Sequence, residues 1–523
     1  MSTTIKLQQP NNEESEIRWF RRLTQRVKET VFVIWRGMEI VVMFSPLVIL
    51  APTAYIVSYA KTLWQSLLGD GSNGFMHATL GIQNEQSKAA DELSDASHHH
   101  DAIKQNRTFA SKIAWSYTLF TLQHLGPAFV KIGQWAATRR DLFPLHFCHQ
   151  LSSLHSHVQT HSFAHTQKAL VDSFGENYES LGLILNEEDE ILGSGSAAQV
   201  YKATIKTSAN ETKSVAVKVL HPNIRTRVER DLALMQYVAN LIDRCIPIQS
   251  IKMLSLPRAV ANFADIMRRQ VDLRIEGNNL EIFRENFQCS SSSAVNFPQP
   301  QNRWVSEQVL VEDYVGDDAR PISDYLEDGS ERGLEERRAL AKTFVSSALK
   351  MVFADNFVHS DLHQGNILVR KEDSSRNGMK YTITFLDAGI ATSLQPNDRK
   401  NLRDLFKAVV MNDGALAGAL MVERARFERC SSIPGGKEKF ASGVQDIVSE
   451  FHDRRKQGLT LGAIRIGALL AKVLDLCRLY QVEIDPAMSS IVISMMVLEG
   501  LGRSLDPDLN LMKSAMPFLL GKV

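Results

Sequence analysis

The chain has 523 residues, enough for more than one hydrophobic core, and its 59 basic residues balance its 59 acidic residues. Proteins that bind nucleic acid usually carry a basic excess, so the zero net charge predicts no nucleic-acid partner. The hydrophobic share of 44% is typical of a globular protein. Five cysteines without CxxC spacing argue against a disulfide framework and favour a reducing compartment.

The N-terminal segment, residues 1–39, precedes a run without charged residues at positions 40–60. The length of this uncharged run suits one transmembrane helix at about 1.5 Å per residue. A buried core helix or a segment lying on a membrane surface is the alternative. Residues 61–106 are expected to form a polar linker.

Residues 107–187 are expected to be helical, with Ser162 as the N-cap of a helix that begins at Phe163. The spacing of four histidines raises zinc binding as an alternative role. Because the four straddle the helix boundary, they need not converge. They are His155, His157, His161 and His165.

From residue 188 the pattern changes to strands around a turn rich in glycine, serine and alanine. Such a turn lets backbone N–H groups approach phosphates without interference from a Cβ atom. The apolar strand 214–219 follows, and its Lys218 is expected to pair with phosphates rather than to be an ordinary strand-edge lysine. The candidate nucleotide-binding residues are Gly193, Ser194, Gly195, Ser196, Ala197, Ala198, Val200 and Lys218.

Residues 223–287 are predicted to be helical, and Asp272 and Glu276 lie four positions apart on one face. One carboxylate from such a helix is needed to orient the strand lysine. Residues 304–314 are predicted to form one strand that ends at a hinge, Val315-Gly316.

The most informative stretch is residues 358–369, in which Asp361 and Asn366 are five positions apart. This is the spacing of a kinase-type catalytic loop, where the Asp faces the acceptor oxygen and the Asn holds a metal ion. A helix over residues 334–354 is expected before it. A solvent-exposed loop between two buried strands is the alternative, since loops are rich in Asp, Asn and Gly.

Asp387 follows an alternating run, residues 381–385, that predicts a strand after a hairpin-like insert at 371–380. Asn366 on a loop and Asp387 at a strand end can converge on Mg²⁺. This ion takes a few hard oxygen ligands from a protein and completes its coordination shell with phosphate and water. Residues 459–480 and 489–501 are expected to be buried C-terminal helices.

Two further motifs carry a resemblance to a known family. Residues 125–134 contain Lys131-Ile132-Gly133-Gln134, and residues 498–507 read Leu-Glu-Gly-Leu-Gly-Arg-Ser-Leu-Asp-Pro. Together with the downstream motifs they resemble the AarF/UbiB/ADCK atypical kinases over about residues 110 to 510. The resemblance implies an α+β, bilobal protein kinase-like fold. Its parts would be a helical extension at 107–187 with the Lys-x-Gly-Gln motif, an N-lobe at 188–315 and a C-lobe at 316–523.

The same resemblance implies a role for each site residue. Lys218 and Glu276 would form the strand-lysine and helix-glutamate pair, and Asp361 would be the catalytic-loop acid. Asn366 and Asp387 would hold Mg²⁺. The Lys-x-Gly-Gln helix would cover the site, with Lys131, Gly133 and Gln134 as gating residues.

The family's properties imply binding of ATP or ADP with Mg²⁺, and an ATPase-like or small-molecule activity rather than ordinary protein phosphorylation. They further imply a link to ubiquinone or related lipid metabolism, with a membrane lipid or quinone precursor and quinone-biosynthesis proteins as partners. The expected location is the mitochondrial inner membrane, with a plastid or another membrane as the alternative.

Two positions depart from the family pattern. The family often has an alanine-rich nucleotide loop, whereas this chain has Gly193 and Gly195, so an altered nucleotide preference is not carried over. Gln270 stands where the family often has an acidic residue, which predicts weaker contacts to the Lys-x-Gly-Gln helix. Both departures favour a divergent mitochondrial branch.

Two other functions compete with the atypical kinase. A small-molecule phosphotransferase of the aminoglycoside or choline kinase type shares the style of the catalytic loop but lacks the Lys131 motif. A non-catalytic pseudokinase scaffold is the other alternative, and the intact Lys218, Asp361, Asn366 and Asp387 count against it.

Overall fold

The computed structural model describes most of the chain from residue 109 onward, together with one short helix before it. The described residues are 35–46, 109–139, 142–143, 145–152, 154, 160–206, 211–245, 255–289, 293–326, 330–374, 378–425, 427–456, 466–509, 514–515 and 517–518. The chain divides into two compact units, which are described separately. The larger one comprises Val130–Glu229 and Ala239–Val523.

The smaller unit is helical where it is described. It contains residues 35–46, helix α4 (Phe109–Leu125) and residues Arg230–Val238 of helix α8 (Ile224–Cys245). Arg36 donates to Asp231 at 2.9 Å, and the Tyr117 hydroxyl donates to the Met43 carbonyl at 3.0 Å. The predicted transmembrane run at 40–60 and the linker at 61–106 fall mainly outside the described residues.

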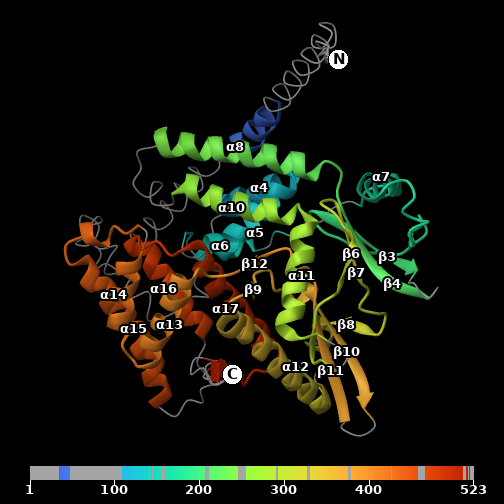
Figure 1. Cartoon of the computed structure of the whole chain (residues 1–523). Helices are drawn as coiled ribbons and strands as arrows, with labels where there is room; N and C mark the ends of the chain where they lie inside the picture. Colours follow the sequence, from blue (N-terminus) through green and yellow to red (C-terminus); the bar gives the residue numbers. More distant parts are fainter. Residues whose placement is uncertain are drawn as a thin grey trace, which may run out of the picture. The chain divides into compact units, whose positions relative to one another are not determined.

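The larger unit begins within α5 (Pro127–Thr138), at Val130, and continues with α6 (Leu145–Leu151) and α7 (Phe163–Phe174), which precede a six-stranded sheet. The sheet order is β1-β3-β4-β7-β6, with β2 paired to β3. Strands β3, β4, β6 and β7 are labelled in Figure 1. Ser162 is the N-cap of α7 as predicted, but its side chain makes no capping hydrogen bond. The strands are β1 (Leu183–Ile184), β2 (Ile191–Ser194), β3 (Ala198–Lys206), β4 (Thr212–Leu220), β6 (Pro300–Val305) and β7 (Val309–Asp313).

Alternation along the strands gives this sheet two different faces, because successive side chains of a strand point to opposite sides. Val215, Val217 and Val219 of β4 belong to an apolar core beneath α7. Phe174 of α7 meets Trp304 edge-on at 5.1 Å. The intervening residues of β4, Ala216 and Lys218, therefore face the opposite side, which carries the cavity.

Helix α11 (Leu273–Phe287) packs on the cavity side of the sheet (Figure 1). Gly277 allows the close approach, because a Cβ atom there would lie 3.2 Å from Val305. Helix α10 (Leu256–Gln270) precedes it, so the region 223–287 is mainly helical as predicted where it is described, with a break between the two helices at Val271 and Asp272. Asp272 is the N-cap residue of α11 and accepts from the Arg274 backbone N–H, so it does not share a helical face with Glu276.

The prediction of one strand over residues 304–314 is wrong. The segment is the end of β6 and all of β7, joined by a turn at Ser306 whose hydroxyl accepts from the Val309 backbone N–H at 2.9 Å. A hydroxyl that binds nearby backbone groups favours a turn over continued pairing. The predicted break at Gly316 does follow β7, and its positive φ of 105° suits glycine.

A second sheet of four strands carries the predicted catalytic loop at one end. Its order is β5-β11-β10-β8, and the predicted hairpin is confirmed by pairing from Ile367↔Phe385 to Ser374↔Gly378. A two-stranded ladder lies beside the loop. The strands are β5 (Val295–Asn296), β8 (Ala319–Pro321), β10 (Ile367–Ser374), β11 (Gly378–Phe385), β9 (Val358–His359) and β12 (Ala391–Thr392).

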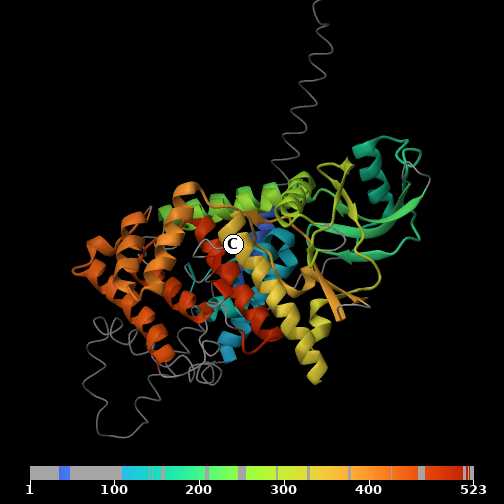
Figure 2. The same cartoon turned by 60° about the horizontal axis from the view of Figure 1, so that its bottom comes forward.

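The C-terminal part is helical, as predicted (Figure 2). The helix before the catalytic loop is α12 (Glu331–Leu349), which continues as a π-helical turn, η2 (Lys350–Asp355). The predicted C-terminal helices correspond to α16 and α17. The remaining elements are η1 (Ile322–Leu326), η3 (Gln364–Asn366), α13 (Pro396–Val410), α14 (Gly414–Arg424), η4 (Cys430–Ser432), α15 (Gly436–Lys456), α16 (Ile466–Tyr480) and α17 (Pro486–Leu505).

One helix of the described residues, Ala487–Leu505 within α17, is long and apolar enough to cross a membrane. This segment is 56% buried inside the protein, and a helix of a protein core can have the same length and composition. Length and composition alone therefore do not decide its role. All five cysteines are free thiols, in agreement with the dispersed pattern of the sequence.

Candidate functional site

A cavity of about 1240 Å³ opens between the two sheets, α5, α10 and α17. Every predicted site residue lines it except Gly133, which is buried in α5. The glycine-rich turn, the strand lysine and the two acidic motifs therefore meet in one place, although almost 200 positions separate the turn from Asp387. Convergence of distant polar groups on one large cavity is the usual mark of a binding or catalytic site.

Lys218 stands at the centre of the cavity's charged residues. Its ammonium donates to both carboxylate oxygens of Glu276 at 2.8 Å and lies 3.3 Å from Asp387 Oδ1. Burial would lower the pKa of Lys218, but the carboxylates of Asp387 and Glu276 outweigh it and raise the pKa above its ordinary value. Lys218 is therefore a fixed cation, and Glu276 is the carboxylate that orients it.

The two carboxylates beside Lys218 have opposite electrostatic environments. Burial raises the pKa of Glu276 to about 7, and Lys218 opposes this while Asp387 adds to it. The pKa of Asp387 is lowered, because Lys218 and then Lys131 outweigh its burial. Asp387 is thus an anion over the whole physiological range, as an electrostatic or metal-binding role requires.

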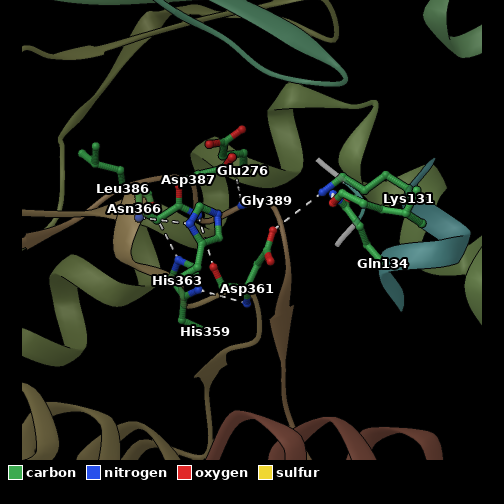
Figure 3. A network of polar contacts seen from close by, with 12 residues as sticks. Lys131, Gln134, Glu276, His359, Asp361, His363, Asn366, Leu386, Asp387 and Gly389 are labelled. Carbon is green, nitrogen blue, oxygen red and sulfur yellow. Dashed lines mark hydrogen bonds and ion pairs between the residues drawn. The ribbon is translucent and has the colours of Figure 1, made fainter. Parts of the chain in front are cut away.

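The catalytic-loop residues are held by a chain of hydrogen bonds shown in Figure 3. His359 Nδ1 accepts from the Asp361 backbone N–H at 3.3 Å, and Nε2 bonds the Leu386 carbonyl at 3.1 Å. This pattern fits a neutral imidazole, and burial lowers the pKa of His359 accordingly. Leu386 N–H in turn donates to the Asn366 carbonyl at 2.8 Å, so the two acidic motifs are tied together.

Asp387 has a left-handed backbone conformation, with φ of 48°, two residues after the end of β11. A non-glycine residue in this region is uncommon and concentrates at functional sites. Asn279 of α11 fixes the following residue by donating to the Ala388 carbonyl at 2.8 Å. The Asp387 side chain is still 44% exposed, so it is held in place but accessible from the cavity.

The residues around Asp387 fit a magnesium ion that is shared with a phosphate group. The Asn366 side-chain nitrogen donates to the Asp361 carbonyl at 3.1 Å, which leaves its amide oxygen as a hard acceptor beside the Asp387 carboxylate. Among the described residues no group of three or more His, Cys, Asp or Glu side chains could hold a metal ion by itself. Mg²⁺ commonly takes one or two protein ligands and completes its shell with water and substrate phosphates.

The turn between β2 and β3 leaves room for a ligand over the cavity. A Cβ atom at Gly193 would meet nothing within 4 Å, and Gly195 N–H donates to the Ala198 carbonyl at 2.9 Å to close the turn. His221 fixes the turn from outside through a 2.9 Å contact with the Gly195 carbonyl. A turn that is fixed by a backbone hydrogen bond and has free space above its glycine suits phosphate binding.

Helix α5 presents its Lys-x-Gly-Gln motif to the catalytic loop. Lys131 Nζ lies 3.9 Å from Asp361 Oδ2, and the two side chains face each other in Figure 3. Gln134 donates to the Leu154 carbonyl at 3.1 Å, and Trp135 packs on Phe263 of α10 at 5.8 Å. An ammonium group of α5 therefore lies beside the carboxylate of Asp361.

The zinc alternative has no support in the described residues. His161 and His165 are paired with other groups, such as the His221 ring and the Leu220 carbonyl, and His155 and His157 lie outside the described residues. Three residues of the site were not singled out from the sequence, namely His359, Asn279 and Glu312. For Glu312 the only local signal is a carboxyl residue at the end of the apolar run Val309-Leu310-Val311, which does not by itself show that the side chain faces a cavity.

Comparison with known proteins agrees with this geometry. The profile of the ABC1 atypical kinase-like domain matches residues 153–419, and that of the UbiB helical domain matches residues 454–510. The chain belongs to the ABC1/UbiB family of atypical kinases. Its fold is accordingly the α+β, two-lobed kinase-like fold that the sequence predicted.

Relatives of this ABC1/UbiB chain include two fungal proteins described as mitochondrial ABC1 family proteins. The Schizosaccharomyces pombe protein C21C3.03 is 34% identical over 468 residues, which cover 77% of this chain and 65% of the relative. The Saccharomyces cerevisiae protein YPL109C is 33% identical, covering 76% and 66%. The chain thus spans just under two thirds of the length of these relatives.

More distant relatives of this ABC1/UbiB protein carry kinase names. The probable protein kinase UbiB of Histophilus somni is 27% identical over 398 residues, covering 76% of this chain and 69% of the relative. Among solved structures, a complex of Rv3197 with erythromycin from Mycobacterium tuberculosis aligns with 16% identity and a TM-score of 0.42. That alignment covers 81% of this chain and 95% of the other.

Proposed function

We propose that this protein is an atypical kinase-like enzyme that binds ATP with Mg²⁺ and transfers the terminal phosphoryl group to water or a small molecule. The observation that carries the proposal is the contact of Lys218 with both Glu276 and Asp387 inside one cavity. In kinases, a lysine held by a helix glutamate and an acid at the metal must both be in place for phosphoryl transfer. Relatives whose names include protein kinase support the class of reaction.

Each residue has a distinct part in this proposal. Lys218 binds nucleotide phosphates, and Glu276 keeps its ammonium aimed into the cavity. Asp361 faces the acceptor or attacking oxygen and takes its hydrogen bond, while the turn at Gly193 and Gly195 covers the phosphates. Asn366 and Asp387 would hold Mg²⁺, which when bound would supply positive charge against the charge that develops on the phosphate oxygens.

Lys131 favours a small acceptor over a protein side chain. Its ammonium lies 3.9 Å from Asp361 Oδ2, so a peptide segment could not place a hydroxyl on that side without displacing α5. Water or a small molecule needs far less space. The gating role of Lys131, Gly133 and Gln134 is part of the proposal, with buried Gly133 acting through the packing of α5.

The physiological setting is proposed from the relatives and the family resemblance. Two of the relatives are named as mitochondrial, which supports a mitochondrial location for this chain. We place the activity at the inner membrane, in support of isoprenoid-quinone or related lipid metabolism, with a membrane lipid or quinone precursor as the partner class.

Thermal unfolding with and without nucleotide tests the proposed site. Mg-ATP at about 100 times its dissociation constant should stabilise the wild type by about 2.7 kcal/mol. Asp387→Asn should lose most of this stabilisation, because the variant removes the metal carboxylate. Absence of stabilisation in the wild type would contradict the proposal.

Genetic complementation tests the metabolic assignment and separates it from a scaffold role. Wild type, Asp387→Asn and Lys131→Ala are expressed in a strain that lacks its related gene, and quinone is quantified. Wild type should restore quinone levels and Asp387→Asn should not. Full restoration by Asp387→Asn would instead favour the non-catalytic scaffold.

A further inference from the structure

Glu312 is a buried carboxyl group to which the proposed phosphoryl transfer assigns no role. Its side chain belongs to a residue that is 9% exposed and lines the cavity from β7. Its Oε2 atom has no hydrogen-bond partner among the described residues. A buried polar group without a partner costs about 1–3 kcal/mol, so its presence in a cavity calls for a ligand that supplies the partner.

The strand register places Glu312 next to Lys218 along the same face of the sheet, two residues further from the glycine-rich turn. Lys218 pairs with Leu310, whereas Glu312 pairs with Ala216, two residues along the strand and on the same face. Two residues of a strand span about 7 Å, the scale that separates the phosphates of a nucleotide from its base. Ala216, which pairs with Glu312, and the apolar Val200 and Leu368 also line the cavity.

We propose that Glu312 recognises the nucleotide base, its carboxyl group accepting a hydrogen bond from the exocyclic 6-amino group of adenine. The inference rests on the proposed nucleotide binding and adds the base that the site selects. An apolar wall for the ring plus one placed hydrogen-bonding group is the usual construction of a small-molecule site. Glu312 is accordingly a specificity-determining residue and takes no part in phosphoryl transfer.

The chemistry predicts which base analogue is rejected. Purine riboside triphosphate has hydrogen in place of the 6-amino group, so the Glu312 oxygen would stay unpaired beneath it. A site built to hydrogen-bond a substrate group discriminates against the analogue that lacks it, because the buried partner is left unsatisfied. GTP is a less direct probe, since a protonated carboxyl could donate to its 6-oxo group.

Calorimetric titration with the Mg²⁺ complexes of ATP and purine riboside triphosphate tests the inference. Wild type should bind ATP about ten-fold more tightly than the analogue. Glu312→Gln keeps an acceptor oxygen and should keep this preference, whereas Glu312→Leu should bind both nucleotides equally. Glu312→Leu should fold, because it replaces a buried carboxyl without a partner by an apolar group of similar size.

The possible outcomes distinguish base recognition by Glu312 from nucleotide binding itself. Equal binding of both nucleotides by the wild type, or an undiminished preference for ATP in Glu312→Leu, would overturn base recognition and leave nucleotide binding intact. Absence of binding to either nucleotide in the wild type would overturn both.

Discussion

At the scale of single residues, the contact between Lys218 and Glu276 is the strongest constraint in the site. Both oxygens of a carboxylate that is 3% exposed accept from one ammonium group at 2.8 Å. Removing one partner of a buried ion pair is costly, because the other charge stays desolvated without compensation. The site therefore depends on Glu276 for stability as well as for the orientation of Lys218.

Glu276→Ala should lower the free energy of unfolding by about 3 kcal/mol, at the lower end of the usual range because Asp387 still faces Lys218. It should also abolish Mg-ATP hydrolysis, since the lysine loses its orientation. Chemical denaturation and phosphate release measure the two effects. Glu281→Ala, on the same helix, is the control and should leave both at the wild-type level; equal effects of the two substitutions would contradict the account.

The raised pKa of Glu312 predicts that the free energy of unfolding depends on pH. Burial, and next the carboxylate of Glu276, raise the pKa of Glu312 to about 8, above its value in the unfolded chain. A raised folded-state pKa means that stability is fully present at low pH and is lost as pH rises towards and through 8. The charges of Lys218, Glu276, Asp387 and Asp313 act on Glu312, and of these groups Glu276 also titrates in this window.

Glu312→Gln removes one titrating group and leaves Glu276 in place. Thermal and chemical unfolding from pH 5 to 9 should show a smaller loss of stability in the variant, by about 1–3 kcal/mol. If the free energy of unfolding changes equally with pH in the wild type and in Glu312→Gln, Glu312 is not held in a protonated, buried state.

The sequence predicted much of the site at this scale, because catalytic spacing is a local property. The spacing of Asp361 and Asn366, and the position of Asp387 after an alternating run, sufficed to place all three in one cavity. Helical spacing alone does not separate Asp272 from Glu276 as the partner of Lys218, because the N-cap role of Asp272 depends on where α11 begins; the family resemblance pointed to Glu276. Glu312 was missed, since strand pairing that no local pattern specifies brings it to the cavity.

At the scale of elements, α5 is the part that distinguishes this site from an open kinase cleft. Its Lys131 faces Asp361, and Trp135 anchors the helix to Phe263 of α10. Gln270 at the end of α10 also lines the cavity. That Gln270 makes weaker contacts to α5 than an acidic residue would make stays a prediction.

Lys131→Ala should raise Mg-ATP hydrolysis several-fold, because it frees the approach of water to Asp361. Steady-state phosphate release measures the effect. The exposed Lys168 of α7 provides a matched control, and Lys168→Ala should leave the rate unchanged. A rate in Lys131→Ala at or below that of wild type would contradict the proposed gating.

The helices α14 and α15 pack closely through glycine. A Cβ atom at Gly418 would lie 2.7 Å from Ala441 Cα, while at Gly500 of α17 it would meet nothing within 4 Å. Gly418→Ala should therefore destabilise the protein by about 1–3 kcal/mol. Gly500→Ala should stabilise it by up to about 1 kcal/mol through helix propensity. Denaturant titration of both variants compares them directly, and equal effects would show that the α14–α15 contact is not tight.

Element prediction succeeded where the pattern is periodic and failed where a turn interrupts it. The hairpin of β10 and β11 and helices α12, α16 and α17 follow from alternation or apolar stripes. The β6–β7 turn was missed, because the apolar residues on both sides of Ser306 resemble one continuous strand.

At the scale of the larger unit, the cavity combines parts that the chain keeps far apart. The first sheet contributes Lys218, the loop between β9 and β10 contributes Asp361 and Asn366, and α17 contributes Ser494 near the C-terminus. Its volume of about 1240 Å³ exceeds the range of about 300–1,000 Å³ that is usual for small-molecule pockets. This leaves room for an acceptor beside a nucleotide, which the sequence could not predict, since volume is a property of packing.

The central claim is that these residues form a chemically complete phosphoryl-transfer site, and Mg²⁺-dependent release of phosphate from ATP tests it most directly. The account predicts measurable release by wild type that requires Mg²⁺ and falls at least about 100-fold in Asp387→Asn. Release by Asp387→Asn at the wild-type rate, or none by wild type with Mg²⁺ present, would contradict it.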